Sequence, residues 1–255
     1  MKKSISFARK HLRLFAALGV LFIPATGLRA EDSLLHSASE KSKALVTLQS
    51  VNATVLAGKP QGIFDKATGR ILILKRIRPV GHARAGSGII IDPRGIIVTN
   101  AHTVRGAGAV SVTFFDGSQA PAKQVSVVPH SDIAFISVRP PFPLASIALA
   151  DSDAVSRGTE IYFIGSSAML KGSLVGGKIS GIVMEKGSSP PHTALLQISP
   201  GAYQGDSGSA VLDRNGNLLG MISLGLPGRR NGTFAATSND IGAAYRSFLK
   251  EFKPD

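Results

Sequence analysis

Apolar and polar residues alternate, or apolar residues run together, in short segments from about residue 44 to residue 236, and glycine, proline and aspartate separate these segments. Alternation with a period of two is typical of strands with one buried face. The expected strands are 46–56, 71–77, 87–91, 96–99, 110–115, 122–128, 133–138, 160–164, 174–184, 194–199, 209–212, 218–223 and 233–236. Many short strands with clear turn sequences are typical of β-sandwiches and β-barrels, so the pattern predicts an all-β fold.

A proline-rich segment separates these strands into two groups of six or seven. In Pro140-Pro141-Phe142-Pro143, three prolines fall within four residues, which excludes both a helix and a central strand. We therefore expect residues 140–146 to be a linker between a first β-unit in 31–139 and a second β-unit in 147–255.

The end of the chain follows a helical period instead. From Asn239 onward the apolar positions are Ile241, Ala244, Tyr245, Phe248 and Phe252, which is the spacing of one face of an amphipathic helix. Ser238 or Asn239 is expected to cap the N-terminus of this helix, with Asp240 in its first turn. The apolar face should pack against a barrel, and no further domain is expected after it.

The first thirty residues have the pattern of a secretory signal peptide. Residues 1–13 contain five lysines and arginines and no acid, residues 14–23 are strongly apolar, and residues 24–30 include several small ones. The apolar run is shorter than the roughly 20 residues that a membrane-spanning helix needs. We expect cleavage after Ala30, or after Gly27, and export to the periplasm or beyond the cell. An uncleaved anchor is the alternative, because the bulky Leu28 lies where signal peptidases prefer small residues. Membrane contact is expected only in that case.

The net charge of +13 suggests a nucleic-acid partner at first. Six of the 29 lysines and arginines belong to residues 1–30, so cleavage after Ala30 leaves 23 cations against 16 acids, a charge of +7. The remaining cations are scattered, and no aromatic side chains lie between them to stack on bases. No nucleic-acid binding is expected.

The chain contains no cysteine, which excludes disulfides, thiol nucleophiles and thiolate metal ligands. With 44% hydrophobic residues, it is too apolar to be a disordered chain. Its six histidines include no pair with the i, i+4 spacing of a helical metal site, so neither a metal nor another cofactor is expected. Any catalysis must use oxygen and nitrogen groups.

The candidate nucleophile is Ser207, in the sequence Gly205-Asp206-Ser207-Gly208 just before an apolar strand. Glycines on both sides of a serine let the backbone form a tight turn whose amide hydrogens point to one place. A structural glycine-rich turn has the same sequence pattern, so the motif alone leaves both interpretations open.

Two further residues are placed to activate a serine. His102 follows the predicted strand 96–99, and Asp132 precedes the predicted strand 133–138. A serine hydroxyl needs a base to accept its proton, and a carboxylate bonded to one ring nitrogen of a histidine leaves the other nitrogen free to act as that base. Because these two residues belong to the first β-unit and Ser207 to the second, the three would meet between the units.

These segments resemble those of the trypsin-like serine proteases. The sequences Thr99-Asn100-Ala101-His102 and Ser131-Asp132-Ile133-Ala134 are most similar to the bacterial HtrA/Deg branch. The resemblance runs from about Ala85 to the C-terminal helix. It implies two six-stranded antiparallel β-barrels and a serine endopeptidase that acts on proteins or peptides. It also implies His102 as general base, Asp132 as its orienting group and Ser207 as nucleophile. The backbone N–H groups of Gly205 and Ser207 would form the oxyanion hole.

The resemblance further implies where a substrate side chain binds. Gly201, six residues before Ser207, would form the base of the pocket for the residue before the scissile bond, the P1 residue. The wall of this pocket would consist of Ser223, Leu224 and Gly225. Since none of these residues carries a charge, we expect a small or medium apolar P1 residue rather than lysine or arginine.

The chain departs from the HtrA pattern in three ways. HtrA proteases usually have asparagine before the serine, whereas this chain has Asp206, whose partner the sequence does not identify. They usually have Gly-Pro after Ser-Gly, whereas Ser209 and Ala210 follow Gly208 here. No PDZ domain is expected after the second β-unit.

Two alternatives to a constitutively active protease stay open. One is a catalytically degenerate peptide-binding module on the same fold, and the other is a protease whose loop 201–208 becomes ordered only on binding a partner or substrate. An esterase is not expected, because Gly205-Asp206-Ser207-Gly208-Ser209 lacks the last glycine of the Gly-x-Ser-x-Gly elbow. The sequence does not determine the oligomeric state.

Overall fold

The structure is a computed structural model of the 255-residue chain. It describes residues 40–51, 61–65, 70–74, 83–140, 142–164, 174–184, 194–201, 206–223 and 233–252. All of these belong to the compact unit formed by residues 37–255. The predicted signal peptide, residues 1–30, lies outside the described residues. Within them, no helix is both long enough and apolar enough to span a membrane.

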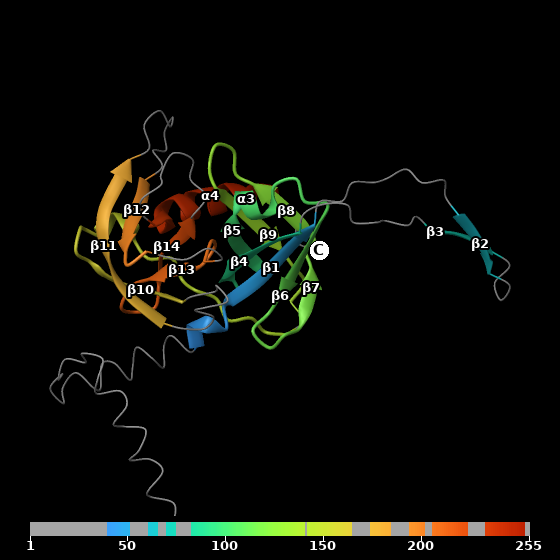
Figure 1. Cartoon of the computed structure of the whole chain (residues 1–255), viewed down its shortest axis with the longest axis horizontal. Helices are drawn as coiled ribbons and strands as arrows, with labels where there is room; N and C mark the ends of the chain where they lie inside the picture. The colour runs from blue at the N-terminus through green and yellow to red at the C-terminus, as the bar shows by residue number, and fades with distance from the viewer. Residues whose placement is uncertain are drawn as a thin grey trace, which may run out of the picture. The chain divides into compact units, whose positions relative to one another are not determined.

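The first half of the fold is a seven-stranded antiparallel sheet (Figure 1). Its strands are β1 (Leu45–Val51), β4 (Ala83–Asp92), β5 (Ile96–Asn100), β6 (Ala109–Thr113), β7 (Gln119–Pro121), β8 (Gln124–Val127) and β9 (Ile133–Ser137), in the order β7-β6-β1-β4-β5-β9-β8. The two edge strands, β7 and β8, are separated by only two residues of chain, so the sheet must curl until its edges approach each other. The result is a half-barrel rather than the closed first barrel expected from the resemblance.

The second half is a closed six-stranded barrel, as the resemblance implied. Its strands are β10 (Glu160–Ile164), β11 (Leu174–Met184), β12 (Ala194–Ser199), β13 (Ala210–Leu212), β14 (Leu218–Ser223) and β15 (Thr233–Thr237), in the closed order β10-β11-β12-β15-β14-β13. Each matches a predicted strand to within one residue at either end. Phe163, Leu196 and Ile222 are buried in its interior. The all-β prediction is confirmed.

A further pair of strands, β2 (Gln61–Asp65) and β3 (Arg70–Leu74), forms a two-stranded antiparallel sheet. The prediction of a strand at 71–77 overlaps β3, but β2 and the three-residue β7 were not predicted. Strand β2 has the sequence QGIFD, with two apolar residues, and β7 has the sequence QAP, with one. Such short segments do not show a period of two, so pairing with a neighbouring strand is what makes them extended.

The segment between the two halves includes the predicted linker 140–146, and the residues directly after it bind both halves by backbone hydrogen bonds. Residues 138–140 and 142–148 contain neither helix nor strand. The N–H of Ile147 donates to the carbonyl oxygen of Ile90 in β4 at 2.9 Å, and the N–H of Leu218 in β14 donates to the carbonyl oxygen of Ala148 at 2.8 Å. Ile147 is fully buried in a hydrophobic cluster with residues of both halves. The segment is therefore irregular, and its end at Ile147 is packed against both halves.

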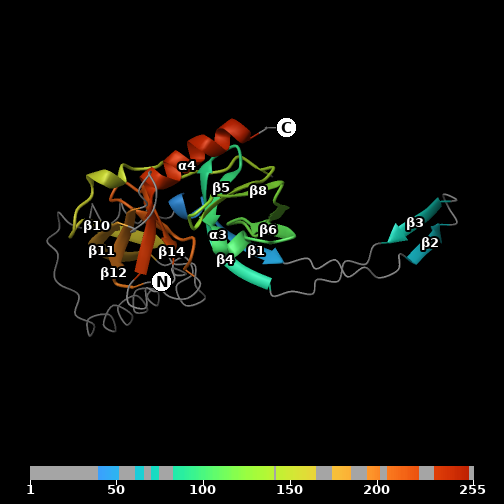
Figure 2. The same cartoon turned by 90° about the horizontal axis from the view of Figure 1, so that it is seen from above.

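The C-terminal helix α4 (Ser238–Glu251) packs on β14 and β15 of the second barrel and on β9 of the first sheet. Figure 2 shows the helix running across both halves. Its N-terminal cap is Thr237, whose Oγ1 accepts from the N–H of Asp240 at 3.2 Å. The prediction that Ser238 or Asn239 caps the helix is therefore wrong. Their side chains instead bind the segment before β10: the Ser238 hydroxyl donates to the carbonyl oxygen of Ala150, and Asn239 Nδ2 donates to Asp151 Oδ1.

The apolar face of α4 is the one that the spacing predicted. Ile241 and Phe248 are buried, and the ring of Phe248 stacks on Phe135 of β9 with centroids 5.1 Å apart. On the same side of the helix, the Tyr245 hydroxyl donates to Asp92 Oδ2 at the end of β4, and Arg94 binds the same carboxylate. This polar cluster fixes the helix to the turn between β4 and β5.

Candidate active site

His102 lies on a single helical turn, α3 (Ala101–Val104), that begins directly after β5. Sequence reasoning placed it after a strand but did not predict this turn. The other three residues of α3 are buried, whereas the side chain of His102 is 42% exposed. The three buried side chains anchor the turn against the sheet, and His102 projects from it toward solvent.

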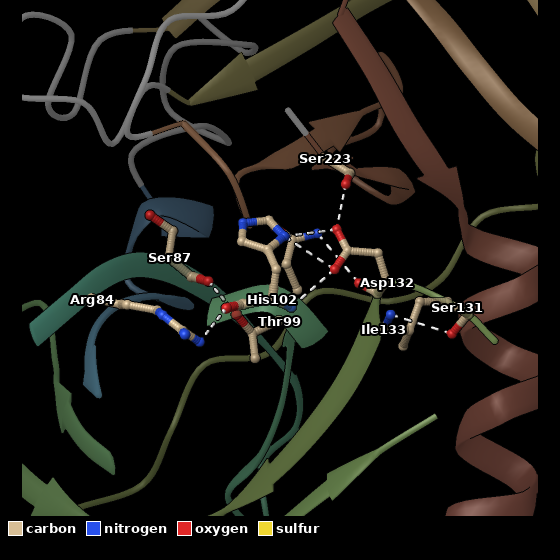
Figure 3. A network of polar contacts seen from close by, with 9 residues as sticks. Arg84, Ser87, Thr99, His102, Ser131, Asp132, Ile133 and Ser223 are labelled. Atoms are coloured by element: carbon tan, nitrogen blue, oxygen red, sulfur yellow. Dashed lines mark hydrogen bonds and ion pairs between the residues drawn. The ribbon is translucent and has the colours of Figure 1, made fainter. Parts of the chain in front are cut away.

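The carboxylate of Asp132 holds both the ring and the backbone of His102 (Figure 3). His102 Nδ1 lies 2.9 Å from Asp132 Oδ2 and 3.0 Å from Oδ1, and the backbone N–H of His102 donates to Oδ1 at 3.0 Å. A carboxylate only accepts hydrogen bonds, so Nδ1 carries the proton in this arrangement and Nε2 of the neutral ring is left as the acceptor.

The pairing of β5 with β9 brings these two residues together. Asn100, the last residue of β5, pairs with Ile133, the first residue of β9, so the residues just beyond the pair, 101–102 and 132, must lie side by side. The N–H of Ala101 donates to the backbone carbonyl of Asp132 at 3.1 Å, which closes the sheet at this end. The long-range contact thus follows from strand register.

Asp132 has a third partner from the other half of the fold. The hydroxyl of Ser223, the last residue of β14, donates to Asp132 Oδ2. Burial alone raises the pKa of Asp132, but the hydrogen bonds from His102 and Ser223 outweigh burial, so the pKa of this carboxyl lies below its ordinary value. Asp132 is therefore held in its charged form.

The hydrogen bond of Ser223 changes the expectation for this residue. It was expected in the wall of the P1 pocket, but its side chain is 2% exposed and is bound to Asp132. Only its backbone is left for contact with a substrate. Leu224 and Gly225, the other expected wall residues, lie outside the described residues, and Gly201 is described and exposed.

Ser207 is half-buried in the turn before β13, and its backbone is held by strands of both halves. The N–H of Ser87 in β4 donates to the carbonyl oxygen of Ser207 at 3.1 Å. The N–H of Gly208 donates to the carbonyl oxygen of Ile222 in β14 at 2.9 Å. Gly208 has a φ of +86°, and a Cβ built on it would lie 2.0 Å from the Ser87 carbonyl oxygen, so no other residue fits this turn.

Strand β4 connects the serine turn to the strand that ends before His102. The Thr99 hydroxyl of β5 donates to the carbonyl oxygen of Ser87 at 2.7 Å, and the N–H of Ser87 binds Ser207. Thr99 is fully buried and lies three residues before His102. One residue of β4, Ser87, is thus bonded through its backbone to the segments of both candidate residues.

The rest of the predicted serine loop is only partly described. Gly205, expected to contribute to the oxyanion hole, lies outside the described residues together with 202–204. Asp206 is fully buried, and its backbone carbonyl accepts from the N–H of Ser209 at 2.9 Å. Among the residues that the structure describes, no group of three or more His, Asp or Glu side chains is placed to bind a metal ion.

Comparison with known proteins gives relatives among bacterial proteases. The periplasmic serine endoprotease DegP of Escherichia coli K12 is 35% identical over 137 residues, which cover 53% of this chain and 29% of DegP. The periplasmic pH-dependent serine endoprotease DegQ of the same strain is 28% identical over 178 residues, covering 64% of this chain and 39% of DegQ. The chain therefore spans less than half the length of these relatives.

The fold agrees with these relationships. The solved structure of the HtrA-type protease AlgW with a decapeptide superposes with a TM-score of 0.64 at 21% identity, over 85% of this chain and 67% of that one. The family model of the trypsin-like peptidase domain matches residues 86–221, more than half of the chain, a range that includes His102, Asp132 and Ser207. The chain belongs to the family of trypsin-like peptidase domains.

Proposed function

We propose that this protein is an exported serine endopeptidase of the HtrA/Deg branch that cleaves peptide bonds through an acyl-enzyme intermediate. The observation that carries the proposal is the contact between His102 Nδ1 and the charged carboxylate of Asp132. The proposal is further supported by the family match and by relatives named as serine endoproteases.

In the proposed reaction, Ser207 Oγ attacks the carbonyl carbon of the scissile bond while its proton passes to His102 Nε2. The imidazolium then gives this proton to the nitrogen of the leaving amine as the C–N bond breaks. A water molecule then attacks the carbonyl carbon of the resulting ester while His102 Nε2 takes one of its protons. The imidazolium returns this proton to Ser207 Oγ as the ester C–O bond breaks and the acid product leaves. The negative charge of Asp132 stabilises the imidazolium in both halves of the reaction.

The backbone N–H groups of Gly205 and Ser207 are proposed to bind the developing oxyanion. Each such donor is worth about 2.7–4 kcal/mol in the transition state. Ser207 is half-buried, and its backbone carbonyl accepts a hydrogen bond from the N–H of Ser87, which supports a fixed position for one of the two donors.

For specificity we propose a small or medium apolar P1 residue, because Gly201 at the expected base of the pocket has no side chain. Leu224 and Gly225 would complete the pocket wall together with the backbone of Ser223. Export is supported by the relatives named as periplasmic and by the signal-peptide pattern of residues 1–30.

Labelling with a serine-directed fluorophosphonate tests the proposal. Folded wild-type protein should be labelled at Ser207, and Ser207→Ala should not be labelled. Labelling of the wild-type protein only after a peptide is added would support an enzyme whose site becomes ordered on binding. No labelling with or without peptide, in protein whose circular dichroism shows a folded state, would contradict the proposal and favour a peptide-binding module.

A cleavage-site profile on denatured casein tests the P1 preference separately. Cuts after alanine, valine or leucine are expected, whereas cuts mainly after lysine or arginine would contradict the pocket assignment and leave the catalytic proposal intact. N-terminal sequencing of the exported protein decides between cleavage after Ala30, cleavage after Gly27 and an uncleaved anchor.

A further inference from the structure

Arg84 is an exposed residue near the start of β4 whose guanidinium group is fixed beside the candidate base (Figure 3). Its Nη1 donates to the backbone carbonyl of His102 at 3.1 Å and to that of Arg105 at 3.1 Å. Both acceptors lie at the end of α3. These two bonds already restrict the rotamers of the long Arg84 side chain. Binding of a ligand to the guanidinium group therefore costs little further side-chain entropy.

No carboxylate neutralises this charge within the described part of the chain. The ion pairs there involve Lys43, Arg94, His102 and Arg214, and none includes Arg84. Carbonyl oxygens accept hydrogen bonds from the guanidinium group but carry no net charge. The positive charge of Arg84 is therefore available to an anion that approaches from solvent.

Arg84 lies on a defined side of the candidate site. A chain of contacts runs from Ser223 to the carboxylate of Asp132, from this carboxylate to the ring of His102, and from the backbone of His102 to Arg84. Ser223 is therefore at one end of the series and Arg84 at the other, with His102 between them, as Figure 3 also shows.

These positions assign the two sides of a bound peptide. In the proposed function, the P1 residue lies against the backbone of Ser223, and His102 protonates the amine nitrogen on the other side of the scissile bond. Ser87, which binds the backbone of Ser207, is three residues along β4 from Arg84, a distance of about 10 Å along a strand. An extended peptide covers this separation in about three residues. The side chain of Arg84 is bonded back to the backbone of His102, which brings its guanidinium group toward the first or second residue after the scissile bond.

We propose that Arg84 is a specificity-determining residue that favours an acidic side chain at the first or second position after the scissile bond. The inference rests on the proposed function, because it requires a peptide bound with its scissile carbonyl at Ser207. It adds to that function a preference on the leaving-group side of the substrate.

The simpler role for Arg84 is to cap the end of α3, and substrate charge separates the two roles. A purely structural residue would affect all substrates equally, whereas a specificity residue changes the ratio between an acidic substrate and its neutral isostere. Glutamate and glutamine have the same shape, so this ratio isolates the charge.

The test uses pairs of internally quenched peptides that differ only in glutamate or glutamine at the first or the second position after the cleaved bond. At low salt and at one of the two positions, kcat/KM of the wild-type protein should be about two- to fivefold higher for the glutamate peptide than for its glutamine counterpart. This is the range expected for an exposed ion pair. High salt should reduce this ratio toward one, because salt screens exposed charges.

Arg84→Gln should lower the ratio to about one, and Arg84→Lys should keep most of it. Arg214→Gln, which removes an exposed cation from the turn between β13 and β14, should leave the ratio unchanged and controls for net charge. If Arg84→Gln does not fold, the salt dependence of the wild-type protein and the Arg84→Lys variant still decide the question.

A wild-type ratio of one at both positions would overturn the inference while leaving the proposed function intact, because cleavage would still occur. A glutamate-to-glutamine ratio of kcat/KM that is as high in Arg84→Gln as in the wild-type protein would also overturn the inference. The absence of any cleavage together with the absence of fluorophosphonate labelling would instead contradict the proposed function, and the inference with it.

Discussion

The hydroxyl of Ser223 donates a hydrogen bond to the carboxylate of Asp132 and thereby joins the closed second barrel to the first sheet at the candidate active site. Asp132 is held on its other side by His102, so a residue from each half of the fold fixes the orientation of one carboxylate. The geometry of the base therefore depends on how the two halves pack.

Ser223→Ala should lower kcat without changing P1 preference. Hydrogen bonds to charged groups contribute about 1.5–3 kcal/mol, so kcat/KM should fall roughly tenfold or more. Loss of the Ser223 donor should also raise the pKa of Asp132, which carbon NMR of the carboxyl group can measure. A role of this side chain in the pocket would change KM and P1 preference instead.

Ser238→Ala is the matched control, because Ser238 is equally buried and donates to a backbone carbonyl, that of Ala150, away from the site. It should reduce the free energy of unfolding but leave kcat/KM unchanged. If folded Ser223→Ala retained full kcat, the positioning role of Ser223 would be refuted.

Gly208→Ala should abolish activity and destabilise the protein. Its added Cβ would lie 2.0 Å from the carbonyl oxygen of Ser87, so the serine turn or strand β4 must move. The control is Gly117→Ala, because Gly117 has the same φ of +86° but no atom within 4 Å of an added Cβ.

In the control, the free energy of unfolding should fall by about 1–2 kcal/mol, which is the cost of placing alanine in the left-handed backbone conformation. Gly208→Ala should cost about 1–3 kcal/mol more, the usual penalty for overpacking. Urea unfolding measures both values and a peptide assay measures activity. Equal destabilisation of the two variants would show that the serine turn does not depend on close approach to Ser87.

Thr99→Val should reduce activity through the backbone of β4. The substitution keeps the shape of the side chain but removes the hydroxyl that donates to the Ser87 carbonyl, while the N–H of Ser87 binds Ser207. A buried carbonyl that loses its partner costs about 1–3 kcal/mol. We expect lower stability together with a fall in kcat, whereas Thr99→Ser should restore both. A folded Thr99→Val with unchanged kcat would show that this bond is only structural.

Much of the fold could be predicted from the sequence because strands and turns are indicated by patterns of neighbouring residues. The strands of the second barrel alternate clearly and are separated by glycine and aspartate turns, so their boundaries followed from the pattern alone. The short strand β7 and the single turn α3 have too few residues to show a period. The N-terminal cap of α4 lies one or two residues earlier than predicted, because Thr237, Ser238 and Asn239 are all suitable cap residues. Ser238 and Asn239 instead form hydrogen bonds with residues 150–152.

Part of the candidate site was also predictable, because its sequence signals are local. His102 and Asp132 adjoin the paired ends of β5 and β9, and both segments have recognisable sequences. The bond from Ser223 to Asp132 joins residues 91 positions apart and depends on the packing of β14 against the first sheet. The interaction of Arg84 with the end of α3 is likewise set by tertiary packing, since α3 was not predicted.

The cluster of Asp92, Arg94 and Tyr245 should make stability depend on pH at both extremes. Hydrogen bonding from Arg94 lowers the pKa of Asp92 to about 2. A carboxyl group whose pKa is lower in the folded state stabilises the protein above its unfolded pKa of about 4, and this stabilisation is lost as the pH falls from 4 toward 2. Burial, together with the hydrogen bond to Asp92, raises the pKa of Tyr245 to about 12. A phenol with a raised pKa stabilises the fold below pH 10, and this contribution is lost between pH 10 and 12.

Thermal unfolding at several pH values tests both arms of this dependence. The difference in Tm between wild type and Asp92→Asn should be largest above pH 4 and should shrink toward pH 2, because the wild-type carboxyl is then protonated. The difference between wild type and Tyr245→Phe should be constant up to pH 10 and should shrink toward pH 12. Asp116→Asn is the control, because among the described residues the Asp116 side chain bonds only to Ser118 in its own turn, so its substitution should have a much smaller effect. A Tyr245→Phe variant as stable as wild type at pH 7 would show that the bond to Asp92 does not hold α4 to the β4–β5 turn.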